Sequence, residues 1–415
     1  MEKFAGFLEK KIVPPLTKFS ENKYMSAVRA GMVATVPFTI IGSIFMIIAH
    51  FPVGGWNKIV APYITILEIP VTATFGCLGI IVTFSIAYEL GKQFKLEAVM
   101  CALVATMSFL LIQIHPKTGD FDMDGLGVQG LFTGIIIAFV SVKVQQILTE
   151  KNLVIKLPES VPPMVIQSFS SLVPLFVLIV GIWIIRFVLG IDINHTVLEI
   201  FKPVVFALNT LPGILVYIFV ITMLWSVGIN GDNTLDPIAA PVFLMYLTAN
   251  VNAMAAGQPL PYITANGFSI AFVNVGGTGA TIALAIILFN SKEIGFRKIS
   301  RMAILPSFFQ INEPIFFGIP IVLNPLLMIP YVLSALTLAA STYLLMFFNI
   351  IARPVVMVPW TTPPIIGPYL VTGGDWRAAV WSVISIFIAI IIYFPFAKIA
   401  ERQRLNAEAT KTAHV

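Results

Sequence analysis

Apolar stretches separated by short polar turns occupy nearly the whole chain. A helix needs about 20 apolar residues to cross a bilayer, and most of these stretches have that length. We therefore predict ten transmembrane helices, near residues 25–50, 71–90, 97–114, 125–148, 169–189, 211–229, 237–255, an eighth that is broken near 276–279, 323–350 and 378–396. Residues 2–23 combine lysines with apolar residues and predict a helix on the membrane surface. Residues 51–70 predict an outer linker, and 191–209 a helix that lies along the membrane or links two bodies.

One apolar stretch, at about 302–320, contains three prolines, a glycine and the carboxylate of Glu313. The prolines disfavour a continuous helix, so the stretch predicts a re-entrant hairpin. Irregular backbone persists at membrane depth only where protein buries it or where it lines a wet cavity, and we expect such a shelter around Glu313. The alternative is a kinked helix in which Gln310 and Asn312 satisfy a purely structural carboxylate.

A second interrupted apolar stretch lies at about 354–370 and is also rich in proline. The basic clusters between the spans place the first hairpin on the cytoplasmic side and this one on the outer side. Two interrupted segments that enter from opposite faces indicate a transporter whose site lies near the membrane midplane. A channel would be expected to show a filter or ring motif, and the sequence contains none.

Composition supports this reading, since 58% of the 415 residues are hydrophobic and 11% are charged. Soluble domains carry about 25% charged residues. The fold class is therefore predicted to be an all-α polytopic membrane protein with about ten transmembrane helices, two re-entrant hairpins and interfacial amphipathic helices. The net charge of +5 comes from basic residues at span ends, which places both termini in the cytoplasm and gives no reason to expect a nucleic-acid partner.

The two cysteines, Cys77 and Cys101, both lie in apolar stretches. Neither a disulfide framework nor a metal site is indicated, and we predict no cofactor. The connector at 156–165 contains three prolines and is the predicted boundary between two halves of the chain.

The candidate substrate-binding residues are mostly neutral hydrogen-bonding groups, together with two carboxylates and an indole. They come from the two hairpins, from the turn after the sixth span and from the break in the eighth: Asn230, Asp232, Asn233, Asn274, Thr278, Asn312, Glu313, Trp360, Thr361 and Thr362. Amides and carboxylates satisfy hydroxyl groups, and an indole offers a flat face to a sugar ring. The set predicts a neutral polyhydroxylated solute, because an anion would require Arg or Lys at this depth.

Several of these residues have simpler interpretations. Trp360 has the chemistry of an interfacial belt residue as well as that of a stacking platform. Asn230 stands before a glycine and suits a helix C-terminus, and Asp232 would have no role if it lay in cytoplasmic water. The glycines at 276–279 lack the Lys-Ser/Thr of a phosphate loop, so they indicate close backbone approach instead.

Several motifs together carry a family resemblance. They are Asn312-Glu313-Pro314 followed by Ile315 to Pro320, Gly276-Gly-Thr-Gly279, Pro359-Trp-Thr-Thr-Pro363, Ala27 to Gly31, Lys156 to Pro162 and Tyr393-Phe-Pro395. In this combination the chain resembles the membrane-spanning IIC component of bacterial phosphotransferase-system sugar permeases. The group it resembles most is the lactose/cellobiose/N,N'-diacetylchitobiose family.

The resemblance implies a bacterial inner-membrane homodimer that moves a disaccharide like an elevator. Residues 1–165, with the fifth span to about 190, would form the dimerising scaffold, and 191–415 the transport domain. A phosphocysteine on a separate IIB protein would then phosphorylate the sugar at its 6-hydroxyl. By position, Glu313 would be the catalytic contact to the reacting sugar, Asn312 would bind its hydroxyls and Trp360 would stack on it.

The chain departs from the family at Gly228-Ile-Asn230-Gly231, where members usually have His in place of Asn. Because Asn carries no proton near neutral pH, three consequences are open. Glu313 alone accepts the proton, or the substrate range is altered, or transport and phosphorylation are less tightly coupled.

Basic residues of this chain suggest that its partner protein has an acidic surface, and two alternative functions remain open. The IIB protein would dock on the cytoplasmic face, where Lys92, Lys95, Arg297 and Lys298 are available. One rival is a proton-coupled secondary sugar transporter that uses Glu313. The other is a sugar receptor that binds without net transport.

Overall fold

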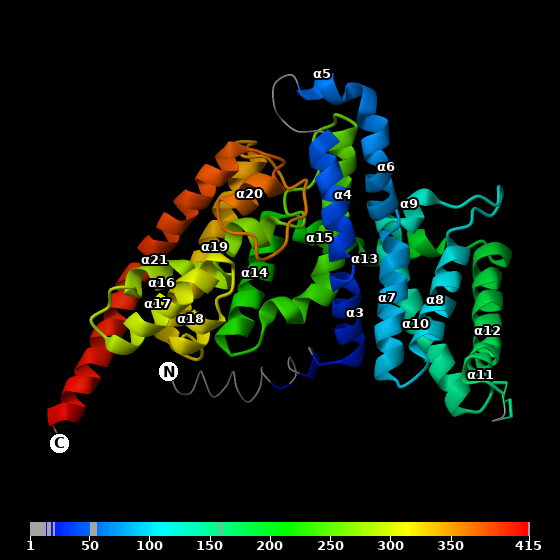
Figure 1. Cartoon of the computed structure of the whole chain (residues 1–415), viewed down its shortest axis with the longest axis horizontal. Helices are drawn as coiled ribbons and strands as arrows, with labels where there is room; N and C mark the ends of the chain where they lie inside the picture. Colours follow the sequence, from blue (N-terminus) through cyan, green and yellow to red (C-terminus); the bar gives the residue numbers. More distant parts are fainter. Residues whose placement is uncertain are drawn as a thin grey trace.

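The computed structural model describes residues 14, 18–19, 21–49, 56–155, 157–158 and 161–413, and within them the secondary structure is helical apart from one isolated bridge between Ile114 and Phe121. Most of the predicted surface helix at 2–23 and part of the proline-rich connector fall outside these residues. In Figure 1 the helices form two side-by-side groups, one from each half of the chain.

The group from the first half is built around one helix, α7 (Leu78–Gln93), which buries Leu78, Val82, Ile86 and Leu90 completely. The other helices of this group are α3 (Lys23–Val33), α4 (Val36–Ala49), α5 (Trp56–Val60), α6 (Ile64–Phe75), α8 (Ala98–Ile112), α10 (Leu131–Glu150), α11 (Pro163–Ser170) and α12 (Leu172–Trp183). Of these, α3, α8 and α10 contact α7. A Cβ added at Gly134 of α10 would lie 2.3 Å from the Thr83 hydroxyl of α7. Such close approach lets helices associate by van der Waals packing, since lipid provides no hydrophobic drive.

The group from the second half contains two interrupted segments between longer helices. Its members are α14 (Leu211–Ser226), α16 (Ile282–Leu288), α17 (Ile294–Phe308), α18 (Glu313–Gly318), α19 (Pro325–Phe347), α20 (Ile366–Val371) and α21 (Trp376–Ala413). Helices α13 (Ile193–Leu208) and α15 (Gly231–Ala255) lie between the groups, and α13 contacts both α10 and α14. Residues 191–209 thus contact both groups of helices, which fits the predicted link between two bodies; that link stays a prediction.

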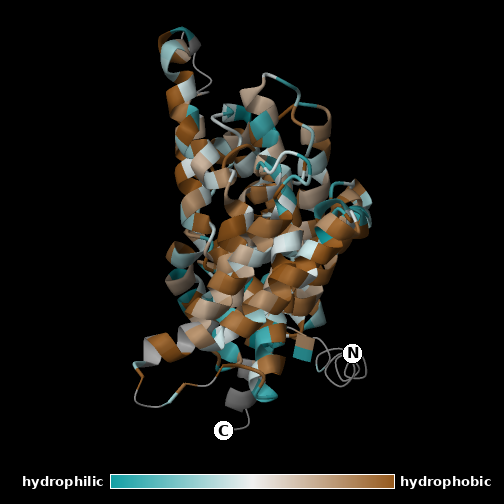
Figure 2. Cartoon of the chain, turned by 90° about the vertical axis from the view of Figure 1, so that its right-hand side faces the viewer, coloured by the Kyte–Doolittle hydropathy of each residue, from teal (hydrophilic) through white to brown (hydrophobic). Residues whose placement is uncertain are grey.

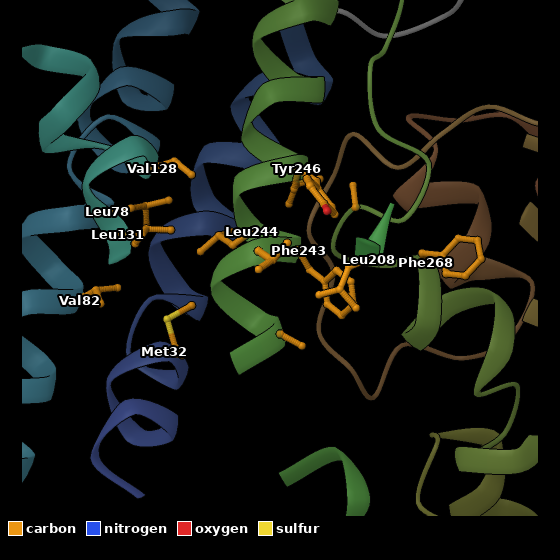
Figure 3. Close-up of a cluster of buried hydrophobic side chains, with 14 of the residues drawn as sticks. Met32, Leu78, Val82, Val128, Leu131, Leu208, Phe243, Leu244, Tyr246 and Phe268 are labelled. Atoms are coloured by element: carbon orange, nitrogen blue, oxygen red, sulfur yellow. The ribbon is translucent and has the colours of Figure 1, made fainter. Parts of the chain in front are cut away.

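A continuous buried cluster crosses from one group to the other. Figure 3 shows Met32 and Leu78 on one side, Leu244 and Phe243 of α15 in the middle, and Phe268 on the far side. The two halves thus share one apolar core in this conformation, and α15 supplies its centre.

The hydropathy pattern agrees with a membrane protein. Apolar residues dominate the middle of the helices, while hydrophilic residues gather towards the upper loops and the lower turns (Figure 2). Among the described residues six helices are long and apolar enough to cross a membrane, or eight if each of two bent pairs forms one span. Two shorter apolar helices, Ala98–Ile112 and Leu211–Ser226, correspond to the remaining predicted spans. The count of ten crossings stays a prediction.

The prediction of a linker at 51–70 is wrong for residues 58–70, which are helical. Residues 58–93 form one long apolar helical stretch of 36 residues, and Pro70 lies inside α6. In membrane helices a proline is tolerated because neighbouring groups satisfy the freed backbone. The proline and the lone Lys58 therefore did not mark the end of the span.

Asn250 of α15 ties together two loops, which contain Tyr262 and Pro354. Its amide donates to the carbonyl oxygens of Tyr262 and Pro354, both at 2.8 Å, and its oxygen accepts from the Tyr262 N–H at 2.9 Å. The side chain is completely buried. We expect Asn250→Ala to lower the free energy of unfolding by about 2–4 kcal/mol, because it leaves buried backbone groups without partners.

Thermal unfolding in detergent measures this effect, and Asn252→Ala, an exposed position on the same helix, is the matched control. Equal unfolding midpoints for the two variants would contradict the role of Asn250.

Candidate functional site

The first interrupted segment consists of α17, residues 309–312 and α18. Glu293 caps the start of α17 by accepting from the N–H groups of Gly295 and Phe296. Pro306 lies in the last turn, Gln310 adopts a left-handed conformation with φ of 68°, and the chain then folds back, since Gly318 lies against Ile299. The fold-back agrees with the predicted hairpin, although the segment begins at residue 294 rather than near 302.

The second interrupted segment consists of the irregular residues 348–365 and α20. It also folds back, because the N–H groups of Val355 and Val356 both donate to the Val371 carbonyl, at 2.8 and 3.1 Å. In Figure 1, α20 lies in the upper part of the left-hand group of helices and α18 in its lower part. Entry of the two segments from opposite membrane faces remains a prediction that this arrangement fits.

A glycine-rich break lies between the two segments in space. A short π-helix (Phe268–Val273) ends at Asn274, and Gly277 follows with φ of 105°. A Cβ at Gly277 would lie 2.3 Å from the Cβ of Asn312, so only glycine lets the first segment approach this closely. This confirms that the glycines at 276–279 serve close backbone approach.

Gln310 joins the break and both interrupted segments. Its side-chain oxygen accepts from the Gly277 N–H at 3.0 Å, and its amide nitrogen donates to the Thr362 carbonyl at 3.2 Å. The side chain is 8% exposed. The sequence suggested Gln310 only as a local partner for Glu313, and that suggestion is wrong. The sequence signal that could have identified the role of Gln310 is an amide side chain next to a helix end that Pro306 breaks.

A chain of hydrogen bonds leads from Asp232 to the first segment. The Asp232 carboxylate accepts from the Trp225 indole at 2.8 Å and from the Thr278 hydroxyl at 3.0 Å. The amide of Asn312 donates to the Thr278 carbonyl at 3.0 Å. Asp232 is therefore held by protein groups and is not simply a carboxylate in water. Trp225 was missed, although an indole N–H in an apolar span needs an acceptor.

The turn after α14 holds two further predicted residues. Asn230 caps the N-terminus of α15, because its side-chain oxygen accepts from the Asn233 N–H at 2.8 Å. The alternative that placed Asn230 at a helix C-terminus is wrong, and the capping oxygen is engaged with backbone. Asn233 itself is exposed.

Glu313 is the first residue of α18 and is exposed. Its carboxylate forms no hydrogen bond or ion pair with any residue that the structure describes, so the expected shelter around Glu313 is not present in this conformation. The protein groups instead surround Asp232. A carboxylate without a protein partner has its full hydrogen-bonding capacity free for a ligand.

The second segment and the break contribute the remaining predicted residues. Trp360 is 56% exposed, Thr361 and Thr362 are half-buried, and the Thr362 carbonyl accepts from Gln310. Asn274 is half-buried, and its carbonyl accepts from the Gly277 N–H at 2.9 Å. Two sets of hydrogen bonds therefore meet at the glycine-rich break: Gln310 bonds to Gly277 and Thr362, and Thr278 bonds to Asp232 and Asn312. Trp360, Glu313, Asn230 and Asn233 lie at neighbouring positions in the sequence.

Comparison with known proteins decides the family. Residues 29–335 match the family described as "Phosphotransferase system, EIIC". The chain belongs to this EIIC family. This EIIC protein is also similar to a solved structure, the "Crystal structure of the transporter ChbC, the IIC component from the N,N'-diacetylchitobiose-specific phosphotransferase system". The TM-score is 0.91 at 33% sequence identity, and the match covers 97% of this chain and 99% of the other.

Curated relatives extend the comparison. The EIIC protein is 34% identical to the lichenan permease IIC component of Bacillus subtilis, over 98% of this chain and 96% of the relative. It is 33% identical to the cellobiose-specific EIIC component of Geobacillus stearothermophilus, with the same coverage. It is 31% identical to the lactose-specific EIICB component of Staphylococcus haemolyticus, over 98% of this chain and 72% of the relative. These matches confirm the resemblance found from the sequence motifs, and the protein is a multi-pass cell-membrane protein.

Proposed function

We propose that this EIIC protein takes up a neutral β-linked disaccharide and presents it to a separate IIB protein, which phosphorylates the 6-hydroxyl. The observations that carry the proposal are the two sets of hydrogen bonds at the glycine-rich break, because together they gather amides, a hydroxyl and a carboxylate between the two fold-back segments. Relatives named for cellobiose, lichenan and N,N'-diacetylchitobiose support the substrate class.

The residues have distinct roles in this proposal. Glu313 accepts a hydrogen bond from the reacting hydroxyl, and its freedom from protein partners supports that role. Asn312 fixes the distance between Glu313 and the glycine-rich break, because its own amide is bonded to Thr278. Trp360 provides an exposed indole on which a pyranose can stack.

Asn230 cannot replace the proton-accepting His of the family. Its oxygen already caps α15, and an amide carries no proton near neutral pH. We infer that Glu313 takes over any proton transfer, which is one of the three consequences left open by the sequence.

The arrangement of the helices in two groups supports an elevator-like movement in this proposal. Residues 1–165, extended to about 190, form the fixed and dimerising part, and 191–415 move as an elevator. The basic end of the molecule, where Lys92, Lys95, Arg297 and Lys298 lie, faces the cytoplasm and receives the phosphorylated IIB protein. In this proposal both chain termini face the cytoplasm, as the basic residues at the span ends favour.

Uptake into proteoliposomes tests the proposal. We expect cellobiose, lactose or N,N'-diacetylchitobiose to accumulate as the 6-phosphate only when phosphorylated IIB protein is on the side of the basic end. Accumulation of free sugar that needs no IIB protein and collapses with an uncoupler would establish the proton-coupled alternative instead. Saturable binding without flux would indicate a receptor.

A further inference from the structure

An apolar pocket of 430 Å³ is lined by none of the hydrogen-bonded residues of the candidate site, and its lining side chains are all apolar. Helix α16 contributes Ile286, α17 contributes Leu305 and Phe308, the second interrupted segment contributes Ile365, and α21 contributes Ile386. The pocket therefore has walls from both interrupted segments. An occupant would touch both at once.

The pocket opens towards the outside of the helix bundle. Leu305 is 67% exposed, and Ile286, Phe308 and Ile365 are 40%, 42% and 41% exposed. Helices α16 and α21 belong to stretches that are apolar enough to cross a membrane, so this opening faces hydrocarbon rather than water. An acyl chain is the chemistry that fits such a lining.

A cation stands at the basic end of the same helix face. Arg301 is exposed and lies four residues before Leu305 and seven before Phe308, so the three side chains share one face of α17. Along the helix axis Arg301 and Phe308 are about 10 Å apart.

The guanidinium of Arg301 is positioned by groups at the end of α16. Its Nε donates to the Phe289 carbonyl at 3.2 Å, and one terminal nitrogen donates to the Asn290 side chain at 3.3 Å. No acidic side chain among the described residues forms an ion pair with it. The remaining N–H groups of the guanidinium are free to bind an anion.

We infer that this pocket binds one anionic phospholipid, with the phosphate at Arg301 and an acyl chain between α17 and Ile365. The lipid tails of the bilayer are as apolar as the pocket, so the acyl chain contributes little to selectivity between phospholipids. Selectivity comes from the charge-assisted hydrogen bonds between Arg301 and the headgroup. The inference does not rest on the proposed sugar site.

The bound acyl chain would stabilise the unusual backbone conformation of Ile365. Ile365 has φ of 73°, which a β-branched residue rarely adopts, and its N–H donates to the Ser382 hydroxyl at 3.1 Å. An acyl chain packed against Ile365 holds the second segment beside α17. The lipid therefore complements the hydrogen bond between Gln310 and Thr362.

Native mass spectrometry from mixed micelles containing equal phosphatidylglycerol and phosphatidylcholine tests the headgroup. We expect the wild type to retain phosphatidylglycerol in preference, and Arg301→Gln to reduce that preference by about fivefold, the effect of one basic residue near an anionic lipid. Arg402→Gln removes an exposed charge from α21 outside the pocket and should leave the preference unchanged. Equal preference in the wild type and in both variants would overturn the inference.

Quenching by brominated acyl chains tests the pocket. Phe308→Trp places a fluorophore in the wall, and Ile391→Trp, at a 72% exposed position of α21 outside the pocket, is the control. After subtraction of wild-type fluorescence, dibrominated phosphatidylglycerol should quench the Phe308→Trp signal at a lower mole fraction than dibrominated phosphatidylcholine does. The Ile391→Trp signal should not distinguish the two lipids. Equal quenching of the Phe308→Trp signal by both lipids would overturn the inference, even if one variant of the first experiment fails to fold.

Discussion

Glu313→Gln is expected to weaken binding of the transported disaccharide by at least about tenfold, which corresponds to about 1.4 kcal/mol. A hydrogen bond from a hydroxyl to a charged acceptor contributes about 1.5–3 kcal/mol, and Gln keeps the shape of Glu but not its charge. Because Glu313 is exposed and forms no bond to the described residues, the substitution should leave protein stability unchanged. Isothermal titration with cellobiose, lactose and N,N'-diacetylchitobiose measures the loss.

Glu97→Gln is the matched control, since it removes an exposed carboxylate from the other group of helices. If Glu313→Gln binds sugar as tightly as Glu97→Gln does, Glu313 has no place in the site. A loss of affinity together with an unchanged unfolding midpoint would instead place the carboxylate against the sugar.

Gly277→Ala is expected to weaken sugar binding at least as much as Glu313→Gln does, because it displaces Asn312. The new Cβ would lie 2.3 Å from the Asn312 Cβ, and φ is 105°. A strained backbone costs about 1–3 kcal/mol, and overpacking costs a further 1–3 kcal/mol, roughly. The Gln310 bond to the Gly277 N–H would be lost as the two segments separate. We expect sugar affinity to fall by about tenfold or more and the unfolding midpoint to fall with it.

Substitutions at two other glycines separate the effect of backbone strain from the effect of overpacking against Asn312. Gly257 also has a left-handed φ, of 63°, but a Cβ there would meet nothing within 4 Å. Gly181 has neither the left-handed φ nor a close neighbour. Gly257→Ala therefore reports backbone strain alone, and Gly181→Ala should be neutral. If Gly277→Ala behaves like Gly257→Ala in both affinity and stability, the close approach to Asn312 is unimportant.

The pattern of residues predicted the interrupted segments well, because their causes are local. Prolines remove backbone donors wherever they stand, and glycines permit conformations that other residues resist. The fold-back at 309–312 and the break at 276–279 both follow from such residues. The boundary of the second span was wrong, since nothing local distinguishes the first half of α6 from a linker, and Pro70 lies within that helix.

The partners of the polar groups did not follow from the sequence. Gln310 bonds to Gly277 and Thr362, which are 33 and 52 residues away, and Thr278 bonds to Asp232 over 46 residues. Neither periodicity nor composition carries information about such distant pairs. For the same reason the sequence assigned the sheltered carboxylate to Glu313, whereas the protein groups enclose Asp232.

The sequence by itself determined that this protein is a helical membrane protein of the EIIC family with two interrupted segments, because hydropathy, proline and glycine act over a few residues. Only the tertiary structure decided which polar groups meet. Those pairs depend on how helices far apart in the chain pack together, and packing is a property of the assembled bundle.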